Sequence, residues 1–156
     1  MSVVIRHLYE NPELLPEVGD WIYQAFWTDQ PGVTVVDLNE RLQEAVNRES
    51  VPLSLVAFLD DKPVGTVNLI ESDDDARPHL KPWLAALYVK PEVRSQGVGA
   101  KLVLELLAEA KRLNISEVYL GTERPDFYAK LGASIHEMAS PTFAIMSFKV
   151  STIATV

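Results

Sequence analysis

Residues 87–100 read LYVKPEVRSQGVGA, and this stretch decides the fold. Its first three residues are typical of a strand, a proline marks a turn, and a glycine-rich loop then opens a helix. Because Gly97 and Gly99 lack a Cβ atom, the backbone of this loop can come close to a ligand. The first N–H groups of the helix have no partner within it, and together with the helix dipole they attract an anion. The stretch therefore predicts a phosphate-binding junction between a strand and a helix.

The spacing of the glycines distinguishes between families of phosphate loop. A dinucleotide fingerprint, G-x-G-x-x-G, requires a third glycine where this chain has Leu102, and the P-loop pattern G-x-x-x-x-G-K-[ST] also fails at that position. The pattern that fits is Arg94-x-x-Gly97-x-Gly99. It resembles the pyrophosphate loop of the GNAT superfamily of N-acetyltransferases, written R/Q-x-x-G-x-G/A.

Two further segments carry the same resemblance. Residues 126–133 read DFYAKLGA and look like the FYxKLGF segment that follows the fifth strand of the superfamily. They lie about thirty residues after the loop, as that fold requires, and depart from the pattern at Ala133, where an aromatic residue is usual. Residues 83–89, WLAALYV, look like the fourth strand of many bacterial members. The resemblance covers most of the chain and is strongest over residues 52–149.

Hydrophobic periodicity predicts elements in the order β-α-α-β-β-β-α-β-α-β-β, which is the order of the GNAT fold. The first helix is expected from Pro12 to about residue 27, with Asn11 as its N-cap and Phe26 on its apolar face. The strands are expected at residues 3–8, 53–59, 64–70, 83–89, 117–122, 134–137 and 143–150, and the other helices at 36–48, 98–113 and, as a short segment, after residue 122. The resemblance implies one α/β (α+β) domain over residues 1–156, with a mixed central sheet of about seven strands and about four helices.

Composition excludes several kinds of protein. At 156 residues with 47% apolar side chains, the chain is expected to build one core, and no run is long enough for a membrane span. Cysteine is absent, so a disulfide, a thiolate metal site and a cysteine nucleophile are excluded, and the three histidines are too scattered to suggest a metal site. No apolar segment with a cleavage site follows a basic start, so a signal peptide is not expected and the protein is predicted to be cytoplasmic.

The distribution of charge separates the two halves of the chain. The net charge of −8 argues against nucleic acid as a partner. Residues 1–80 hold 15 acids and 5 bases, whereas residues 81–156 hold 7 acids and 9 bases. The first half would repel a polyanion and attract a cation. Residues 1–80 are therefore predicted to form mainly the acceptor side, for a cationic amine, and residues 81–149 mainly the cofactor side; acidic surface that only aids solubility is the alternative reading.

The resemblance implies acetyl-CoA as the cosubstrate and no metal. Its pyrophosphate is expected on backbone N–H groups of the loop, with a charge-assisted bond from Arg94. Its pantetheine arm is expected to pair with main-chain groups of Leu87 and Val89, and the Val89 N–H is the expected donor to the thioester carbonyl as charge builds there. The expected cofactor-binding residues are Leu87, Tyr88, Val89, Arg94, Ser95, Gln96, Gly97, Val98, Gly99 and Ala100.

Tyr128 is the expected general acid, because it matches the family position whose phenol reaches the thioester sulfur. A phenol with a pKa near 10 is about matched to a departing alkyl thiolate. The general base is left open among Glu71 at the end of the third strand, the acids of residues 73–75, and solvent acting through ordered water. The other reading of the acidic run is a solvated loop.

The acceptor site is expected between the loop of residues 27–34, the acidic loop and Trp83, with Trp21, Tyr23 and Trp27 as candidate walls. The predicted activity is direct transfer of an acetyl group to a primary amine. The acceptor itself is left open between a small amine, an aminoglycoside-like molecule and a protein amine. A non-catalytic acyl-CoA sensor, an acyltransferase for longer chains, and a homodimer also stay open.

Overall fold

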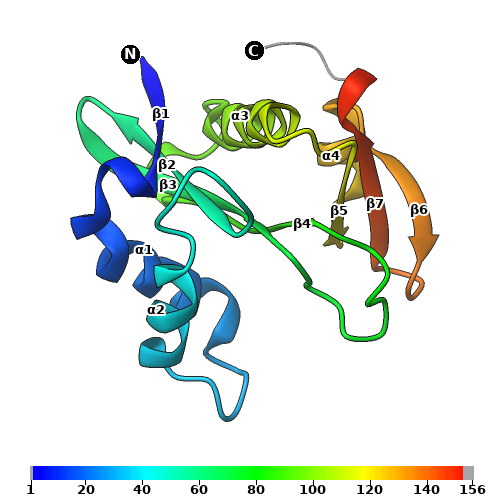
Figure 1. Cartoon of the computed structure of the whole chain (residues 1–156), viewed down its shortest axis with the longest axis horizontal. Helices are drawn as coiled ribbons and strands as arrows, with labels where there is room; N and C mark the ends of the chain where they lie inside the picture. Colours follow the sequence, from blue (N-terminus) through cyan, green and yellow to red (C-terminus); the bar gives the residue numbers. More distant parts are fainter. Residues whose placement is uncertain (1, 153–156) are drawn as a thin grey trace.

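The computed structural model describes residues 2–152, which form one seven-stranded mixed sheet with α-helices on both of its faces (Figure 1). The strand order is β1-β2-β3-β4-β5-β7-β6, and only β4 and β5 run parallel. The strands are β1 (Val3–His7), β2 (Leu53–Leu59), β3 (Lys62–Ile70), β4 (Trp83–Val89), β5 (Glu117–Thr122), β6 (Ser134–Met138) and β7 (Ala144–Lys149). The helices are α1 (Leu15–Ile22), α2 (Val35–Gln43), α3 (Val98–Arg112) and α4 (Pro125–Lys130). The predicted fold class and element order are confirmed.

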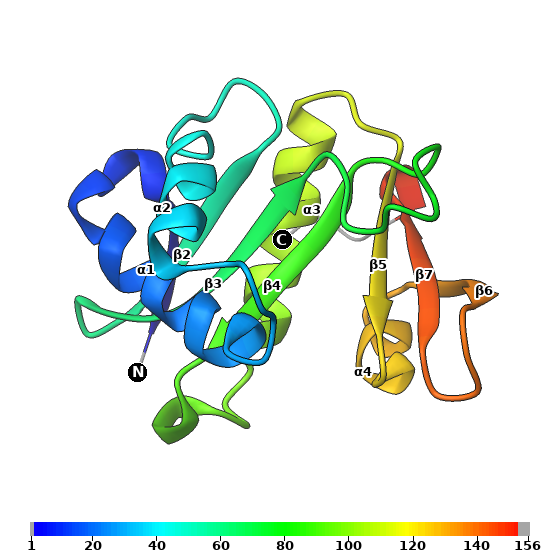
Figure 2. The ribbon, with the colours of Figure 1, turned by 90° about the horizontal axis from the view of Figure 1, so that it is seen from below.

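Each face of the sheet has its own apolar core. The stripe of α3 that includes Leu102, Leu106 and Ala110 is fully buried against β2 to β5, as the 3.6-residue spacing predicts. On the opposite face, α1 and α2 pack through Val18 and Leu42 against side chains of β2. Figure 2 shows α1 and α2 in front of the sheet and α3 behind it.

The start of the first helix differs from the prediction. Asn11 makes no capping bond through its side chain, and Pro12–Leu14 form a 3-10 turn before α1 begins at Leu15. The reason is Pro16, which has no N–H to donate to the carbonyl of Pro12, so an α-helix cannot begin there. The Leu15 N–H bonds that carbonyl instead.

The end of the first helix also differs. After Ile22 the chain continues as a π-helical turn, Tyr23–Trp27, and Phe26 is 46% exposed instead of lying in the core. A π-helical turn rotates the following side chains away from the face that a regular α-helix would present, and it is often found at functional sites. It directs Phe26 and Trp27 toward the cavities described below.

The second helix is shorter than predicted at its C-terminus, and the turn between β2 and β3 is tighter than the predicted strand bounds imply. α2 begins with a capping box between Thr34 and Asp37 and ends at Gln43. The side chain of Asn47 ends it by donating to the carbonyls of Glu44 and Pro52. In the hairpin, residues 60 and 61 alone turn the chain, both with positive φ (51° and 64°), so β3 begins two residues before the predicted start.

Candidate active site

The sheet opens in its middle, between β4 and β5. Only Trp83 and Tyr119 pair across these two strands, and the strands then diverge (Figure 2). β4 also carries a bulge, because its register against β3 shifts between Thr66 and Asn68. Ala86 lies in this bulge with φ 52°. This divergence leaves main-chain groups of β4 without a β5 partner, at the strand where the pantetheine arm is expected to pair.

The glycine-rich loop joins this opening to α3. Gly97 is the N-cap residue of α3 with φ 84°, a conformation that glycine adopts at no steric cost, and Ser95 also has a positive φ of 64°. The N–H of Lys101 bonds the Gly97 carbonyl, so the N–H groups of residues 98–100 have no partner within the helix. A 15-residue helix thus presents its positive end to the opening, as the sequence predicts for an anion site.

A groove of about 710 Å³, here called the loop groove, runs along β4, the glycine-rich loop and α4. All the predicted cofactor-binding residues except Gln96 line it. A Cβ atom placed on Gly99 would lie 3.6 Å from the Phe127 ring and 3.8 Å from Val89 Cγ2. Both neighbours line the groove, so a side chain at position 99 would project into it.

Arg94 spans the same groove. Its Nε donates to the Val89 carbonyl at 2.8 Å, and its guanidinium carbon lies 5.7 Å from the centre of the Tyr88 ring. The guanidinium therefore lies along the end of β4, where the pantetheine arm is expected to pair. An exposed arginine in this position has N–H groups left over for an anion.

Tyr128 lies on α4 at the wall of the loop groove, with its ring 4.9 Å from the Phe127 ring in an edge-on arrangement. Burial raises the pKa of its phenol to about 12. The expectation of a phenol near 10 that matches a thiolate therefore needs correction, because at this pKa the phenol holds its proton more tightly than a thiol does.

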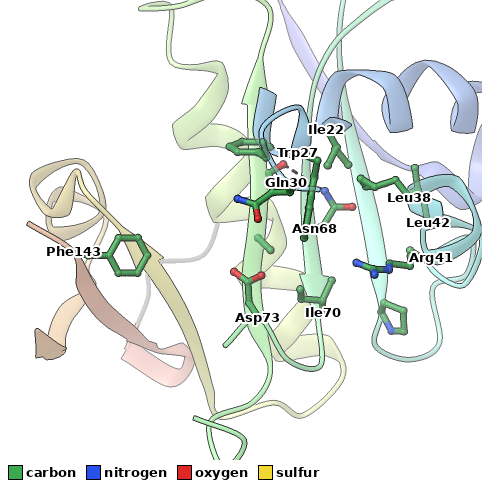
Figure 3. Close-up of a pocket in the computed structure, with 15 residues that line it drawn as sticks. Ile22, Trp27, Gln30, Leu38, Arg41, Leu42, Asn68, Ile70, Asp73 and Phe143 are labelled. Atoms are coloured by element: carbon green, nitrogen blue, oxygen red, sulfur yellow. Dashed lines mark hydrogen bonds between the residues drawn. The ribbon is translucent and has the colours of Figure 1, made fainter. Parts of the chain in front are cut away.

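A second cavity of about 570 Å³, here called the apolar cavity, lies on the α1–α2 side of β4 (Figure 3). Its walls come from α1, the π-helical turn, α2, β3, β4 and the segment before β7. Phe26 lines both this cavity and the loop groove, and Ala86 of the bulge lines this cavity while Leu87 lines the groove. The two spaces therefore meet at the bulge of β4.

Most of the lining of the apolar cavity is hydrophobic, and four polar side chains interrupt it. The apolar lining residues are Ile22, Phe26, Trp27, Leu38, Leu42, Ala45, Pro52, Ile70, Ala85, Ala86 and Phe143. The polar ones are Gln30, Arg41, Asn68 and Asp73. Asn68 points its amide toward the Ala86 carbonyl at 3.5 Å.

The acids of the β3–β4 loop have different roles. Asp74 accepts a bond from Arg77 at 2.7 Å, and Arg77 in turn makes a two-pronged pair with Glu137 of β6. Asp73 lines the apolar cavity, and its carboxylate makes no hydrogen bond or ion pair with any residue between 2 and 152. Desolvation by the surrounding protein, and then the charge of Asp74, raise the pKa of Asp73 to about 6, although the residue is exposed to solvent.

The remaining predicted site residues lie in several places. Glu71 is exposed just after β3 and lines neither cavity. Among the aromatic candidates, Trp27 lines the apolar cavity, whereas Trp21 is buried against Tyr88 with ring centres 5.7 Å apart. Trp83 is also core, and its indole N–H donates to the Leu80 carbonyl at 2.7 Å. Tyr23 lines neither cavity.

Several lining residues were not predicted. Thr122, the last residue of β5, and Arg124, which follows that strand, line the loop groove, and Arg41 and Phe143 line the apolar cavity. In the sequence Arg41 is one charged residue of a predicted helix, and nothing in the sequence indicates which face of that helix it occupies. Phe143 reaches the cavity because Gly121 of β5 leaves room for its ring, which lies 2.6 Å from where a Cβ would stand.

The described part of the chain supports neither a metal site nor a membrane-spanning helix. Between residues 2 and 152, no three His, Asp or Glu side chains gather in a way that could hold a metal ion. None of the helices in that range has the length and apolar character that a bilayer crossing requires.

Comparison with known proteins agrees with the motifs. The acetyltransferase (GNAT) family model matches residues 19–133, while no curated protein matches the chain by sequence. Among solved structures, the paiA N-acetyltransferase of Thermoplasma acidophilum, in complex with coenzyme A, is 28% identical (TM-score 0.66; 96% of this chain and 99% of that one).

Two more distant structures share the fold. The putative acetyltransferase yncA of Salmonella typhimurium, with acetyl-CoA, is 17% identical (TM-score 0.74; 99% and 98% covered). An aminoglycoside 6'-N-acetyltransferase complexed with coenzyme A is 20% identical (TM-score 0.72; 94% and 97% covered). The family match spans most of the chain, and the glycine-rich loop lies where the motifs predicted it. The chain therefore belongs to the GNAT family of acetyltransferases, and the predicted class of enzyme, an acetyl-CoA-dependent N-acetyltransferase, is confirmed at the level of the family.

Proposed function

We propose that this protein transfers the acetyl group of acetyl-CoA, bound in the loop groove, directly to a primary amine bound in the apolar cavity. The observation that carries the proposal is the junction of the two spaces at the bulge of β4, where Phe26 lines both. An amine entering from one side and a thioester from the other would meet at this point. Direct transfer fits a chain without cysteine, since no thiol can carry the acetyl group in between.

The residues of the loop groove fit acetyl-CoA. The free N–H groups at the start of α3 would hold the pyrophosphate, and the space beside Gly99 would admit it. Arg94 would donate to a phosphate oxygen. Its guanidinium now bonds the Val89 carbonyl, and release of that bond would free the carbonyl to pair with the pantetheine arm.

Tyr128 is proposed to assist departure of the thiolate by donating a hydrogen bond. With a pKa of about 12, the phenol stays protonated across the neutral range and is a weaker acid than an alkyl thiol, whose pKa is about 8.5. It therefore stabilises the negative charge on sulfur without surrendering its proton. In the balanced reaction, the ammonium first loses one proton, the neutral amine forms the N–C bond, and the C–S bond breaks. The nitrogen then loses a second proton to solvent, which balances the proton that the thiolate takes up from solvent.

Asp73 is proposed as the group that receives the proton from the acceptor ammonium. Glu71 and Asp73 both follow β3, but only Asp73 lines the apolar cavity. Above pH 6 its carboxylate is charged and has no partner among residues 2–152, so it is able to bind an ammonium and accept its proton. Glu71 remains the alternative base, acting through water from outside the cavity.

The test is release of free coenzyme A from acetyl-CoA with a panel of primary amines. Tyr128→Phe is expected to lower kcat at least tenfold while leaving the Kd for coenzyme A within about twofold, because it removes one hydrogen bond made to the departing sulfur. Tyr119→Phe is the matched control, since this tyrosine packs on Trp83 and lines neither cavity. Equal rates in both variants would place the donor elsewhere. Tight binding of acetyl-CoA without turnover of any amine would contradict the enzyme reading and favour a sensor.

A further inference from the structure

The charges of the apolar cavity define the kind of amine that it accepts, provided that the cavity is the acceptor site of the proposed function. We propose that the acceptor is a zwitterionic apolar monoamine: one primary ammonium, an apolar body and one carboxylate, as in an apolar amino acid or dipeptide. Three observations carry this inference: a single acid in the lining, a single base in the lining, and hydrophobic walls elsewhere.

Asp73 supplies the position for the ammonium. It is the only acid among the lining residues, and no side chain between residues 2 and 152 neutralises it, because Arg77 is occupied by Asp74 and Glu137. Asp73 is exposed to solvent, and a ligand that displaces water from its carboxylate against the hydrophobic walls must supply a cationic partner in return. An ammonium at Asp73 would meet this need, and in Figure 3 Asp73 lies on the side of the cavity that faces Phe143.

Arg41 supplies the position for the carboxylate. It reaches the cavity from α2 and is held over the Trp27 ring, with its guanidinium carbon 5.7 Å from the ring centre. Asp37, one turn earlier on α2, lies near enough for its charge to act but forms no ion pair with Arg41. The forked N–H groups of Arg41 are therefore available for a ligand carboxylate, which arginine binds through two parallel bonds.

The positions of Asp73 and Arg41 would hold the ammonium and the carboxylate of the ligand apart. Figure 3 shows Asp73 and Arg41 on opposite sides of Ile70, with apolar side chains around them. An apolar body between an ammonium and a carboxylate would fill the space between them. A polyamine or an aminoglycoside carries several ammonium groups, and this lining offers one carboxylate and one repelling guanidinium. The net negative charge of residues 1–80 thus does not extend to the cavity wall, where one acid and one base balance.

The experiment compares amines that differ only in the carboxylate. The probes are L-leucyl-L-phenylalanine and its C-terminal amide, L-phenylalanine and phenethylamine, with spermidine and kanamycin as polycations. The wild-type enzyme is expected to prefer the acid in at least one pair by tenfold or more in kcat/KM, and to use both polycations more slowly. In Arg41→Gln the preference within that pair should fall to less than about threefold, because the acid loses the partner of its carboxylate.

Asp73→Asn tests the other end of the ligand. It is expected to raise KM for both members of the pair at least tenfold. It should also abolish the loss of kcat/KM that the wild type shows as the pH falls through about 6, a change that a purely structural role would not produce. Arg48→Gln and Asp61→Asn are charge-matched controls on exposed residues that line neither cavity, and both should behave like wild type.

Binding gives a second readout that does not need turnover. Calorimetric titration of the preferred acid into the protein saturated with coenzyme A should give a tenfold tighter Kd than titration of its neutral counterpart, and Arg41→Gln should remove the difference. Fastest turnover of spermidine or kanamycin, or equal use of acid and neutral partner by the wild type, would overturn the inference while leaving the proposed transfer intact. Absence of coenzyme A release with every probe would instead count against the proposed function.

Discussion

Substitution of Gly99 by alanine should have opposite effects on the stability of the protein and on its affinity for the cofactor. Gly99 is the second residue of α3, and a Cβ there would meet its nearest atoms at 3.6–4.0 Å, which is ordinary van der Waals contact. Since alanine favours a helix over glycine by up to about 1 kcal/mol, Gly99→Ala should raise stability slightly. In a chain of this length, that corresponds to an increase in Tm of about 2–4 °C at most.

The same methyl group should weaken acetyl-CoA binding. Its nearest neighbours, Phe127, Val89 and Leu87, all line the loop groove, so the methyl occupies space through which the cosubstrate would pass. Displacing the pyrophosphate from one N–H would cost a hydrogen bond to a charged group, about 1.5–3 kcal/mol. This corresponds to a Kd for coenzyme A that is about 10- to 150-fold higher.

The assay pairs calorimetric titration of coenzyme A with thermal unfolding of the same preparation. Gln96→Ala is the control, because Gln96 belongs to the same loop, is exposed and does not line the groove. It should leave both quantities close to wild type. A Kd unchanged by Gly99→Ala would refute the placement of the cosubstrate beside α3. A lower Tm would refute the inference that the added methyl group fits without a clash.

Three further perturbations test separate parts of the molecule. Gly97→Ala meets no atom within 4 Å but must adopt φ 84°, so it should lower the free energy of unfolding by about 1–2 kcal/mol, measured by urea denaturation. Gly121→Ala would displace the Phe143 ring, and amine kinetics should show an altered KM for the acceptor with an unchanged Kd for coenzyme A. Burial alone would raise the pKa of Glu109, but hydrogen bonds from Arg112 and His7 hold this pKa below its usual range. This stabilisation is present above the unfolded pKa near 4.3 and is lost as the pH falls through the folded pKa, so Glu109→Gln should destabilise by about 1–3 kcal/mol at pH 7 and progressively less below pH 4.

Local chemistry made much of the fold predictable from the sequence. The start of α3 was predicted at Val98, because a glycine loop followed by a 3.6-residue apolar stripe has few other structures. The bounds of β4 and β5 were also predicted correctly, since their apolar residues end at turn residues. The first helix was mispredicted because two rules competed. Pro12 suits a helix start, but the second proline, Pro16, removes the N–H that the first turn would need.

The proposed cofactor side of the site was more predictable than the proposed acceptor side, and the reason is physical. A phosphate is bound by backbone groups of one continuous loop, so the glycines in that loop are visible in the sequence. The apolar cavity is instead built from side chains of six separate segments, and their meeting depends on tertiary packing. Nothing local distinguishes Asp73 from Asp74; only the pairing of Asp74 with Arg77 leaves Asp73 as the acid that faces the cavity.

The separation of the two sides suggests how this fold can change its acceptor while keeping its chemistry. With acetyl-CoA bound as proposed, the loop groove depends on main-chain N–H groups and on the absence of a side chain at Gly99, so few substitutions there would be compatible with the cosubstrate. The apolar cavity depends on side chains such as Arg41 and Phe143, which contact solvent on one side and can be replaced without opening either core. Phe26 is the exception, because it lines both spaces. A change at Phe26 should therefore alter the KM values of both substrates, whereas a change at Arg41 should alter only that of the amine.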